Sequence, residues 1–164
     1  DVLLDAIEKF NLEHLNNNNA CFIIAGSSSI DIRSILKDRF KDHDNIVYLG
    51  EVNDFDREKI YALSDVVIFP SRYESFGLVP LEAFVHGKPV IASNSGAIPE
   101  VVINNYCGLL FEDGNSQALA DKIALLNNDD SVVAKLSEGA LLRVRELSSY
   151  NSAKESIDLY NTLV

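Results

Sequence analysis

The sequence is poor in positive charge. It has 14 lysine and arginine residues against 25 aspartate and glutamate residues, which gives its 164 residues a formal net charge of −11 at pH 7. Such a charge disfavours nonspecific binding to nucleic acid and the docking of a polybasic patch on a membrane. No apolar run reaches the roughly 18 residues that a membrane-spanning helix requires. We therefore expect no nucleic-acid partner and no membrane span in this chain.

Cysteine is scarce, and signals of secretion are missing. The two cysteines, Cys21 and Cys107, lie far apart in the sequence, each in an apolar stretch. Because unpaired cysteines are among the most buried residue types, we predict two buried thiols in a reducing compartment. The sequence has no N-x-S/T glycosylation site and no signal-peptide pattern. These absences favour a cytoplasmic location.

Catalytic and metal-binding motifs are also lacking. Neither a Ser/His/Asp nor a Cys/His signature is present, and there is no P-loop lysine motif. His86 lies four residues after Glu82, a spacing that a metal-binding pair can use. No further ligand stands near this pair, so we expect no metal and no other cofactor.

What the sequence does have is an alternation of apolar runs and helical patterns. Short apolar runs predict strands at 21–25, 46–49, 66–69, 89–92 and 108–111. Helical spacing predicts helices at 2–10, 31–40, 54–63, 78–86, 116–127, 131–146 and 152–163. Asp54 is the expected N-cap of the third helix. Apolar strands separated by helices indicate one α/β domain, a Rossmann-like parallel sheet with helices on both faces.

Loops rich in glycine, serine or asparagine follow the first four predicted strands. They lie at 26–29, 50–53, 70–77 and 93–96, and the first of them begins at Gly26. Ligands of parallel sheets bind outside the carboxyl ends of the strands. We therefore expect the four loops to meet in one crevice.

The most informative stretch runs from Pro70 to Ala83, where a predicted strand leads through a turn into a helix. At such a junction, free backbone N–H groups and the positive end of the helix dipole form a natural anion site. The candidates for a phosphate cradle are Ser75, Phe76, Gly77, Leu78 and Val79. The alternative is that Gly77 serves only the turn.

Two glutamates flank this proposed anion site. Glu82 lies one turn into the helix, where a carboxylate can accept both hydroxyls of a ribose. Glu74 precedes the turn and is placed to hold sugar hydroxyls. Either glutamate can instead be a solvated charge or a partner of the helix dipole. Phosphate and hydroxyl groups occur together in a sugar nucleotide, although Arg72 and Lys88 are the only cations near the expected crevice.

The stretch from Pro70 to Glu100 resembles the retaining glycosyltransferases of family 4, which have the two-domain GT-B fold. Their signature of two glutamates separated by seven residues is matched by Glu74 and Glu82. The similarity continues through Ala83, Gly87, Pro89–Ser93, Gly96, Glu100 and Gly108–Leu110. It extends over nearly the whole chain, with Ala97 standing where the family often has a second glycine.

The resemblance implies that residues 1–164 form the nucleotide-sugar-binding domain, the C-terminal half of a GT-B enzyme of hexosyltransferase type. Glu82 would bind the ribose, and Glu74 would contact the transferred sugar as the catalytic residue that positions it. The amides of residues 76–79 would face the sugar and phosphates, and the backbone around Glu51 and Val52 would meet the base. The donor would be a UDP-, GDP- or ADP-sugar, and the acceptor a saccharide, a lipid-linked glycan or another molecule.

The resemblance also implies parts that this sequence does not contain. The chain begins within a helical pattern, Asp1–Ile7. The family's phosphate-binding arginine and lysine belong to a glycine-rich segment before the first helix, and its acceptor domain is N-terminal. We therefore expect a fragment of a larger enzyme that binds donor weakly and does not turn over alone. Peripheral contact of the parent enzyme with the inner face of a membrane stays open.

Two other functions fit parts of the pattern. The chain can be a non-catalytic module that binds a nucleotide sugar or a phosphate. A GT-B-type sugar-nucleotide epimerase has less support, because no pair of acid and base carboxylates on opposite sides of a sugar can be placed in this half. Replacing Glu82 by alanine separates a ribose-binding site from a purely structural helix.

Overall fold

The computed structural model describes residues 2–13, 20–28, 30–41, 43–74 and 77–148. The predictions for Ser75, Phe76 and a helix at 152–163 lie outside these residues. The described elements are α1 (Val2–Glu13), β1 (Phe22–Ala25), α2 (Ile32–Arg39), β2 (Ile46–Gly50), α3 (Asp54–Leu63), β3 (Val67–Phe69), α4 (Leu78–Val85), β4 (Val90–Ser93), α5 (Ile98–Val101), β5 (Gly108–Phe111), α6 (Ser116–Asn128) and α7 (Asp130–Glu146).

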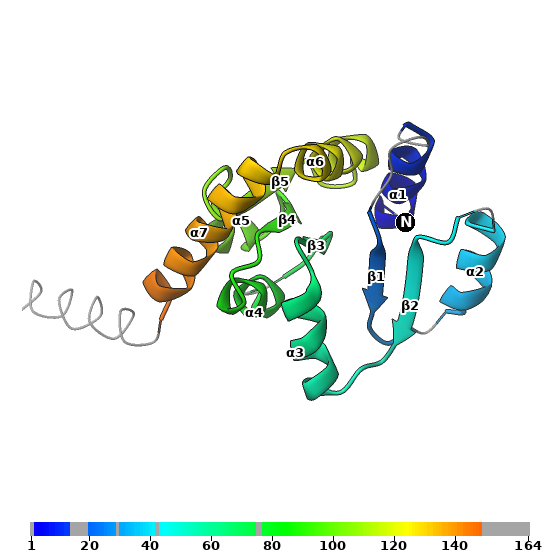
Figure 1. The fold of residues 1–164 in the computed structure, drawn as a ribbon, viewed down its shortest axis with the longest axis horizontal. Helices are drawn as coiled ribbons and strands as arrows, with labels where there is room; N and C mark the ends of the chain where they lie inside the picture. The colour runs from blue at the N-terminus through cyan, green and yellow to red at the C-terminus, as the bar shows by residue number, and fades with distance from the viewer. Residues whose placement is uncertain (1, 14–19, 29, 42, 75–76, 149–164) are drawn as a thin grey trace, which may run out of the picture.

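All described strand pairs are parallel, which confirms the predicted α/β fold class. The strands form two ladders in place of one continuous sheet (Figure 1), with β1 beside β2 and the order β3-β4-β5 in the second. The two ladders share core contacts through α1 and α6, since buried residues of both helices lie in one apolar cluster with Phe22 and Ile91. The sheet is therefore divided, while one apolar cluster extends across both ladders.

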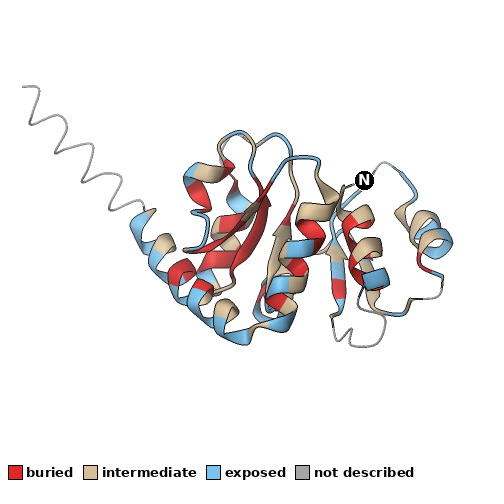
Figure 2. Cartoon of the chain, turned by 90° about the horizontal axis from the view of Figure 1, so that it is seen from above, coloured by how far each residue is buried: buried red, intermediate tan, exposed pale blue. Residues whose placement is uncertain are grey.

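Strand β4 lies at the centre of the larger ladder and is buried on both faces (Figure 2). Ile91 packs into the apolar cluster that contains α1 and α6. Val90 and Ala92 point the opposite way, into a second cluster with Phe84 of α4 and Ala140 of α7. Successive side chains of a strand alternate between faces, so this pattern requires helices on both sides of β4.

Short polar residues start several of the helices. Asn53, not Asp54, is the N-cap of α3, and its side chain accepts a hydrogen bond from the amide of Asp56. Asn115 and Asp129 cap α6 and α7 in the same way. Each cap satisfies an amide that has no partner within the helix, which fixes where the helix begins.

One of the two cysteine predictions is wrong. Cys107 is buried, whereas Cys21 is exposed. Cys21 immediately precedes β1, so it points to the same face as Ile23, which is 41% exposed, while Phe22 between them is buried. An apolar stretch indicates a strand but does not show that both of its faces are covered. No described helix combines the length and the low polarity needed to cross a bilayer.

Candidate functional site

The loops that follow β3 and β4 are bound to each other. The fully buried Ser93 donates its hydroxyl hydrogen to the carbonyl oxygen of Ser71, and Ser95 donates to the carbonyl oxygen of Arg72 at 2.7 Å. Gly96 adopts a left-handed φ of 54°, and a Cβ atom there would lie 3.3 Å from the carbonyl oxygen of Glu74. The loop that leads to α4 is thus fixed by the end of the central strand.

Glu74 lies in this fixed loop and is half-buried. Its Oε1 atom is 3.4 Å from the hydroxyl oxygen of Ser71, which donates to it. The same serine accepts from Ser93 through its backbone, so β4 and the Glu74 side chain are linked through one residue. This geometry restricts Glu74 to the carboxyl ends of β3 and β4, where the sequence predicted it.

The N-terminus of α4 has the features of an anion site. Gly77 is its N-cap, with a left-handed φ of 76°, and among the described residues no side chain caps the helix. The amides of the first turn have no partners within a helix, and Pro80 contributes none because proline lacks an N–H. Within this turn Leu78 is 65% exposed and Val79 is half-buried, whereas Gly77 and Pro80 are buried. Gly77, Leu78 and Val79 therefore lie where a phosphate cradle was predicted.

Glu82 is held by two residues of α3. The hydroxyl of Tyr61 donates a hydrogen bond to Oε2 of Glu82 at 2.9 Å, and Nε of Arg57 is 3.6 Å from the same oxygen. Tyr61 is only 8% exposed, whereas the Glu82 side chain is 34% exposed. Burial, and then the hydrogen bond to Glu82, raise the pKa of Tyr61, so its hydroxyl stays a donor at neutral pH.

His86 contacts a different glutamate from the one suggested by its spacing. Its Nε2 atom is 2.7 Å from Oε2 of Glu58, and its ring stacks on Tyr61 with 5.6 Å between the ring centroids. Within the described ranges, no group of three or more His, Cys, Asp or Glu residues could hold a metal ion. Independence from metals stays a prediction.

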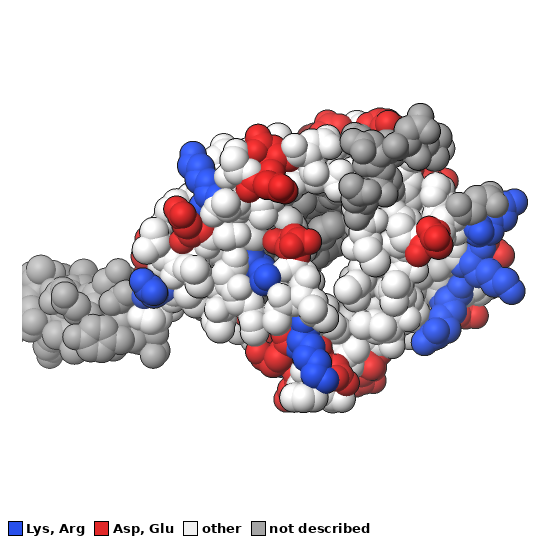
Figure 3. Space-filling view, in the orientation of Figure 1, with Lys and Arg blue, Asp and Glu red and all other residues white. Residues whose placement is uncertain are grey.

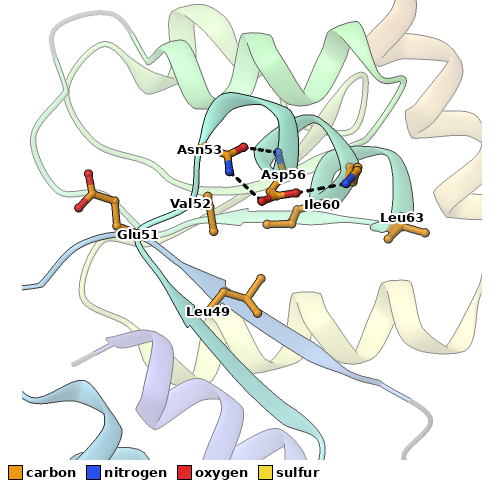
Figure 4. Close-up of a pocket in the computed structure, with 8 residues that line it drawn as sticks. Leu49, Glu51, Val52, Asn53, Asp56, Ile60 and Leu63 are labelled. Atoms are coloured by element: carbon orange, nitrogen blue, oxygen red, sulfur yellow. Dashed lines mark hydrogen bonds and ion pairs between the residues drawn. The ribbon is translucent and has the colours of Figure 1, made fainter.

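A pocket of about 420 Å³ lies between the end of β2 and α3 (Figure 4). Leu49, Val52, Ile60 and Leu63 form its apolar wall, and Asp56 bonds to Asn53 at 2.9 Å and to Lys59 at 3.2 Å along its edge. Figure 4 shows the carboxylate of Glu51 directed away from this wall. Glu51 and Val52, the residues expected near a base, therefore belong to an open and largely apolar pocket.

Gly26 is placed at the end of the smaller ladder. Its amide donates to the carbonyl oxygen of Gly50 at 2.8 Å, and its own carbonyl accepts from the hydroxyl of Tyr48 at 3.2 Å. Among the described interactions, no hydrogen bond or ion pair connects Gly26 to Glu74 or Glu82. Figure 3 shows a small opening between the part that holds β1, β2 and α2 and the rest. One crevice shared by all four loops stays a prediction.

Few cations surround the α4 N-terminus. Arg72 is exposed and lies 3.4 Å from Asp113, while Lys88 follows the other end of α4. Figure 3 shows lysine and arginine side chains gathered instead over α2, at the far side of the molecule. Backbone amides, with the helix dipole, are therefore the main positive elements that the described residues offer to an anion there.

Sequence reasoning missed the residues that hold the two glutamates. Tyr61 occupies an apolar position of α3, where a tyrosine is indistinguishable from a core residue. Ser93 and Ser95 were read only as turn residues. The signal that could have found them is their position, since side chains at strand ends and on neighbouring helices converge on the same edge of a parallel sheet.

Comparison with known proteins gives matches over most of the chain. The sequence pattern of the family described as glycosyl transferases group 1 matches residues 1–143. An uncharacterized glycosyltransferase of Methanocaldococcus jannaschii is 33% identical over 150 residues, which cover 89% of this chain and 38% of that protein. A D-inositol 3-phosphate glycosyltransferase of Corynebacterium urealyticum is 39% identical over 104 residues, covering 63% and 24%. The chain thus spans less than half the length of these relatives.

Solved structures share the fold. The crystal structure of TarM aligns with a TM-score of 0.82 at 26% identity and covers 98% of this chain and 32% of that protein. HepE of Anabaena, solved in complex with UDP, aligns with a TM-score of 0.78 at 24% identity, over 99% of this chain and 44% of that protein. TarM thus contains a similar domain within a longer chain, and HepE has a similar fold.

Proposed function

This chain belongs to the glycosyl transferases group 1 family, and we propose that it is the donor-binding domain of a two-domain, retaining glycosyltransferase of GT-B type. The observation that carries this proposal is the start of α4. There an uncapped helix N-terminus lies between two glutamates that are each fixed by neighbouring residues, Glu74 by Ser71 and Glu82 by Tyr61. One anion site with two acceptors for hydroxyl groups matches a nucleotide sugar.

Each part of the donor has a place in this proposal. The amides of Gly77, Leu78 and Val79 bind phosphate oxygens, because amides of the first helical turn have no partners within the helix. Glu82 accepts the ribose hydroxyls. Glu74 accepts hydroxyls of the transferred sugar, and in the retaining reaction it positions that sugar and does not attack it.

The base is proposed to lie toward Glu51 and Val52. The pocket beside them has an apolar wall from β2 and α3, which suits the face of a nucleobase. HepE of Anabaena has been solved in complex with UDP and, in a separate structure, in complex with UDP-glucose. For this chain the donor is proposed as a UDP-, GDP- or ADP-sugar with a hexosyl group, and the acceptor is bound by another domain of a longer enzyme.

The proposal makes the chain a binding domain that is incomplete for catalysis. Of the described cations, Arg72 in the Glu74 loop lies 3.4 Å from Asp113, and Arg57 lies 3.6 Å from Glu82, so acidic side chains already face both. We therefore expect weak binding of donor and no turnover by the chain alone. A non-catalytic nucleotide-sugar module would bind in the same way, and activity of the longer enzyme distinguishes the two.

The test is calorimetric titration with UDP, GDP and ADP, in the presence of EDTA because no metal is expected. Saturable binding of one nucleotide, weakened by about 1–3 kcal/mol in Glu82→Gln, supports the ribose assignment. Glu138→Gln is the matched control, since Glu138 is an exposed glutamate on α7. Equal affinities of the wild type and Glu82→Gln would contradict the proposal.

A further inference from the structure

The carboxylate of Glu82 is held from one side only. Its Oε2 atom accepts the hydroxyl of Tyr61 at 2.9 Å and lies 3.6 Å from Nε of Arg57. Its Oε1 atom has no partner among the described residues. One oxygen is thus fixed by α3, while the other is left for a ligand.

The tyrosine is itself immobilised. Tyr61 is 8% exposed, and its ring stacks on His86, whose imidazole is 2.7 Å from Glu58. Glu58 and Tyr61 both belong to α3, and His86 directly follows α4, so the stack joins the two helices next to the Glu82 carboxylate. A side chain with so little freedom loses little conformational entropy when it makes its hydrogen bond.

Arg57 competes for the same carboxylate. Its Nε atom is buried and has no hydrogen-bond partner in the part of the chain that the structure describes, although Oε2 of Glu82 is 3.6 Å away. A buried donor without a partner carries an energetic penalty, so a modest turn of the Glu82 side chain toward it would be favourable. The hydrogen bond from Tyr61 opposes that turn.

We infer that Tyr61 is a positioning residue that directs the free oxygen of Glu82 toward the ribose of the donor. The inference rests on the proposed function, because it assumes that Glu82 binds ribose. Without the hydroxyl of Tyr61, the Glu82 carboxylate turns toward Arg57, and its free oxygen no longer points toward the ribose. Tyr61 itself does not touch the donor.

The experiment measures discrimination between ribose and a sugar without hydroxyls. UDP, GDP and ADP and their 2′,3′-dideoxy counterparts are titrated into the wild type, Tyr61→Phe and Glu82→Gln. The readout is the ratio of the two dissociation constants for the nucleotide that binds. Tyr106→Phe is the matched control, because Tyr106 donates at the same 2.9 Å to a different glutamate, Glu146 of α7.

Three results are expected. The wild type binds the dideoxy compound about 10- to 100-fold more weakly than the ribonucleotide, as expected for hydrogen bonds to a carboxylate. Tyr61→Phe reduces this ratio about three- to tenfold without changing the affinity for the dideoxy compound. Tyr106→Phe retains the ratio of the wild type.

Other results separate the inference from its premise. A full ratio in Tyr61→Phe together with a lost ratio in Glu82→Gln overturns the positioning role and leaves the proposed function intact. Equal weakening of both ligands in Tyr61→Phe assigns a structural role and overturns the inference. A full ratio in Glu82→Gln, or no binding of any nucleotide by the wild type, removes the premise and the inference with it.

Discussion

The two ladders of this molecule are built from similar apolar strands but differ in how they are covered. All four residues of β4 are buried, with helices on both faces. In the smaller ladder, Ile23, Val47 and Leu49 are each 41% exposed on one face. Composition alone therefore does not decide burial, because the connections determine which faces receive a helix.

Glycine positions show the same difference in packing. A Cβ atom on Gly108 would overlap the backbone carbonyl of Val90, and one on Gly139 would overlap that of Tyr106. Around Gly26 and Gly50, no described residue lies within 4 Å of such an atom. The larger ladder with α7 is closely packed, and the ends of the smaller ladder are open.

The candidate site uses both kinds of structure. Its glutamates are fixed by the packed part, through the buried Ser93 and the buried Tyr61. Its apolar pocket lies in the open part, beside Leu49 and Leu63. Helix α3 belongs to both, because Tyr61 faces α4 while Ile60 lines the pocket. Rigid groups are thereby combined with an accessible surface.

The difference in packing between the two ladders should have its largest effect on the reactivity of the two thiols. Cys21 is exposed and should react with a thiol reagent at the rate of a free cysteine. Cys107 is buried, its pKa is raised by burial, and it reacts only through opening of the packed part, on the order of a thousandfold more slowly. The measurement is labelling kinetics of Cys21→Ser and Cys107→Ser variants. Similar rates for the two thiols would contradict the difference in packing.

Truncating one isoleucine in each ladder should also show the difference in packing. Ile91→Ala removes a side chain that is 1% exposed and should lower the free energy of unfolding by about 3 kcal/mol. Ile23→Ala removes one that is 41% exposed and should cost under about 1 kcal/mol. Urea denaturation of both variants measures the difference. Equal losses would show that the face of β1 is covered after all.

The hydroxyl of Ser93 should matter more than that of Ser95. Ser93→Ala leaves the Ser71 carbonyl without its buried partner and should cost about 1–3 kcal/mol of stability, with weaker binding of donor. Ser95 is only half-buried, so Ser95→Ala should cost about 0.5–1 kcal/mol. Denaturation and titration of both variants test this order. A reversed order would place the anchor of the Glu74 loop elsewhere.

The smallest expected effect concerns a surface ion pair of the open part. The hydrogen bond from Arg39 lowers the pKa of Asp5 below its ordinary value of 3.8. A lowered folded-state pKa contributes stability above 3.8 that is lost as the pH falls through the lower value. Asp5→Asn should cost under about 1 kcal/mol at pH 7 because the carboxylate is exposed. Near pH 3 the stability difference between Asp5→Asn and the wild type should be smaller than at pH 7. A larger difference near pH 3 would contradict the lowered pKa of Asp5.

The sequence predicted the strands and most helices because the apolar runs and helical spacing are local signals. It did not predict the division into two ladders, since pairing depends on segments far apart in the chain. The misplacement of Cys21 has the same origin: the residue lies in an apolar run, but it points to the face on which Ile23 is 41% exposed. The cap at Asn53 was one residue off because Asn and Asp are both good N-caps.

The sequence marks the residues at the centre of the candidate site, but not the residues that hold them. Gly77, Glu74 and Glu82 are marked by a strand, turn and helix in succession, which a single segment reveals. Tyr61 and Ser93 act on that segment from elsewhere, through contacts that only the folded chain creates. Residues that hold functional groups are therefore harder to find in a sequence than the groups themselves.

The central claim is that the start of α4 binds a nucleotide sugar, and chemical-shift mapping tests it most directly. UDP, GDP and ADP are added in turn to the ¹⁵N-labelled chain while its amide signals are followed. The account predicts saturable shifts at Gly77, Leu78, Val79 and Glu82 for one of the nucleotides. Shifts confined to the β1–β2 ladder, or none with any of the three, would contradict it.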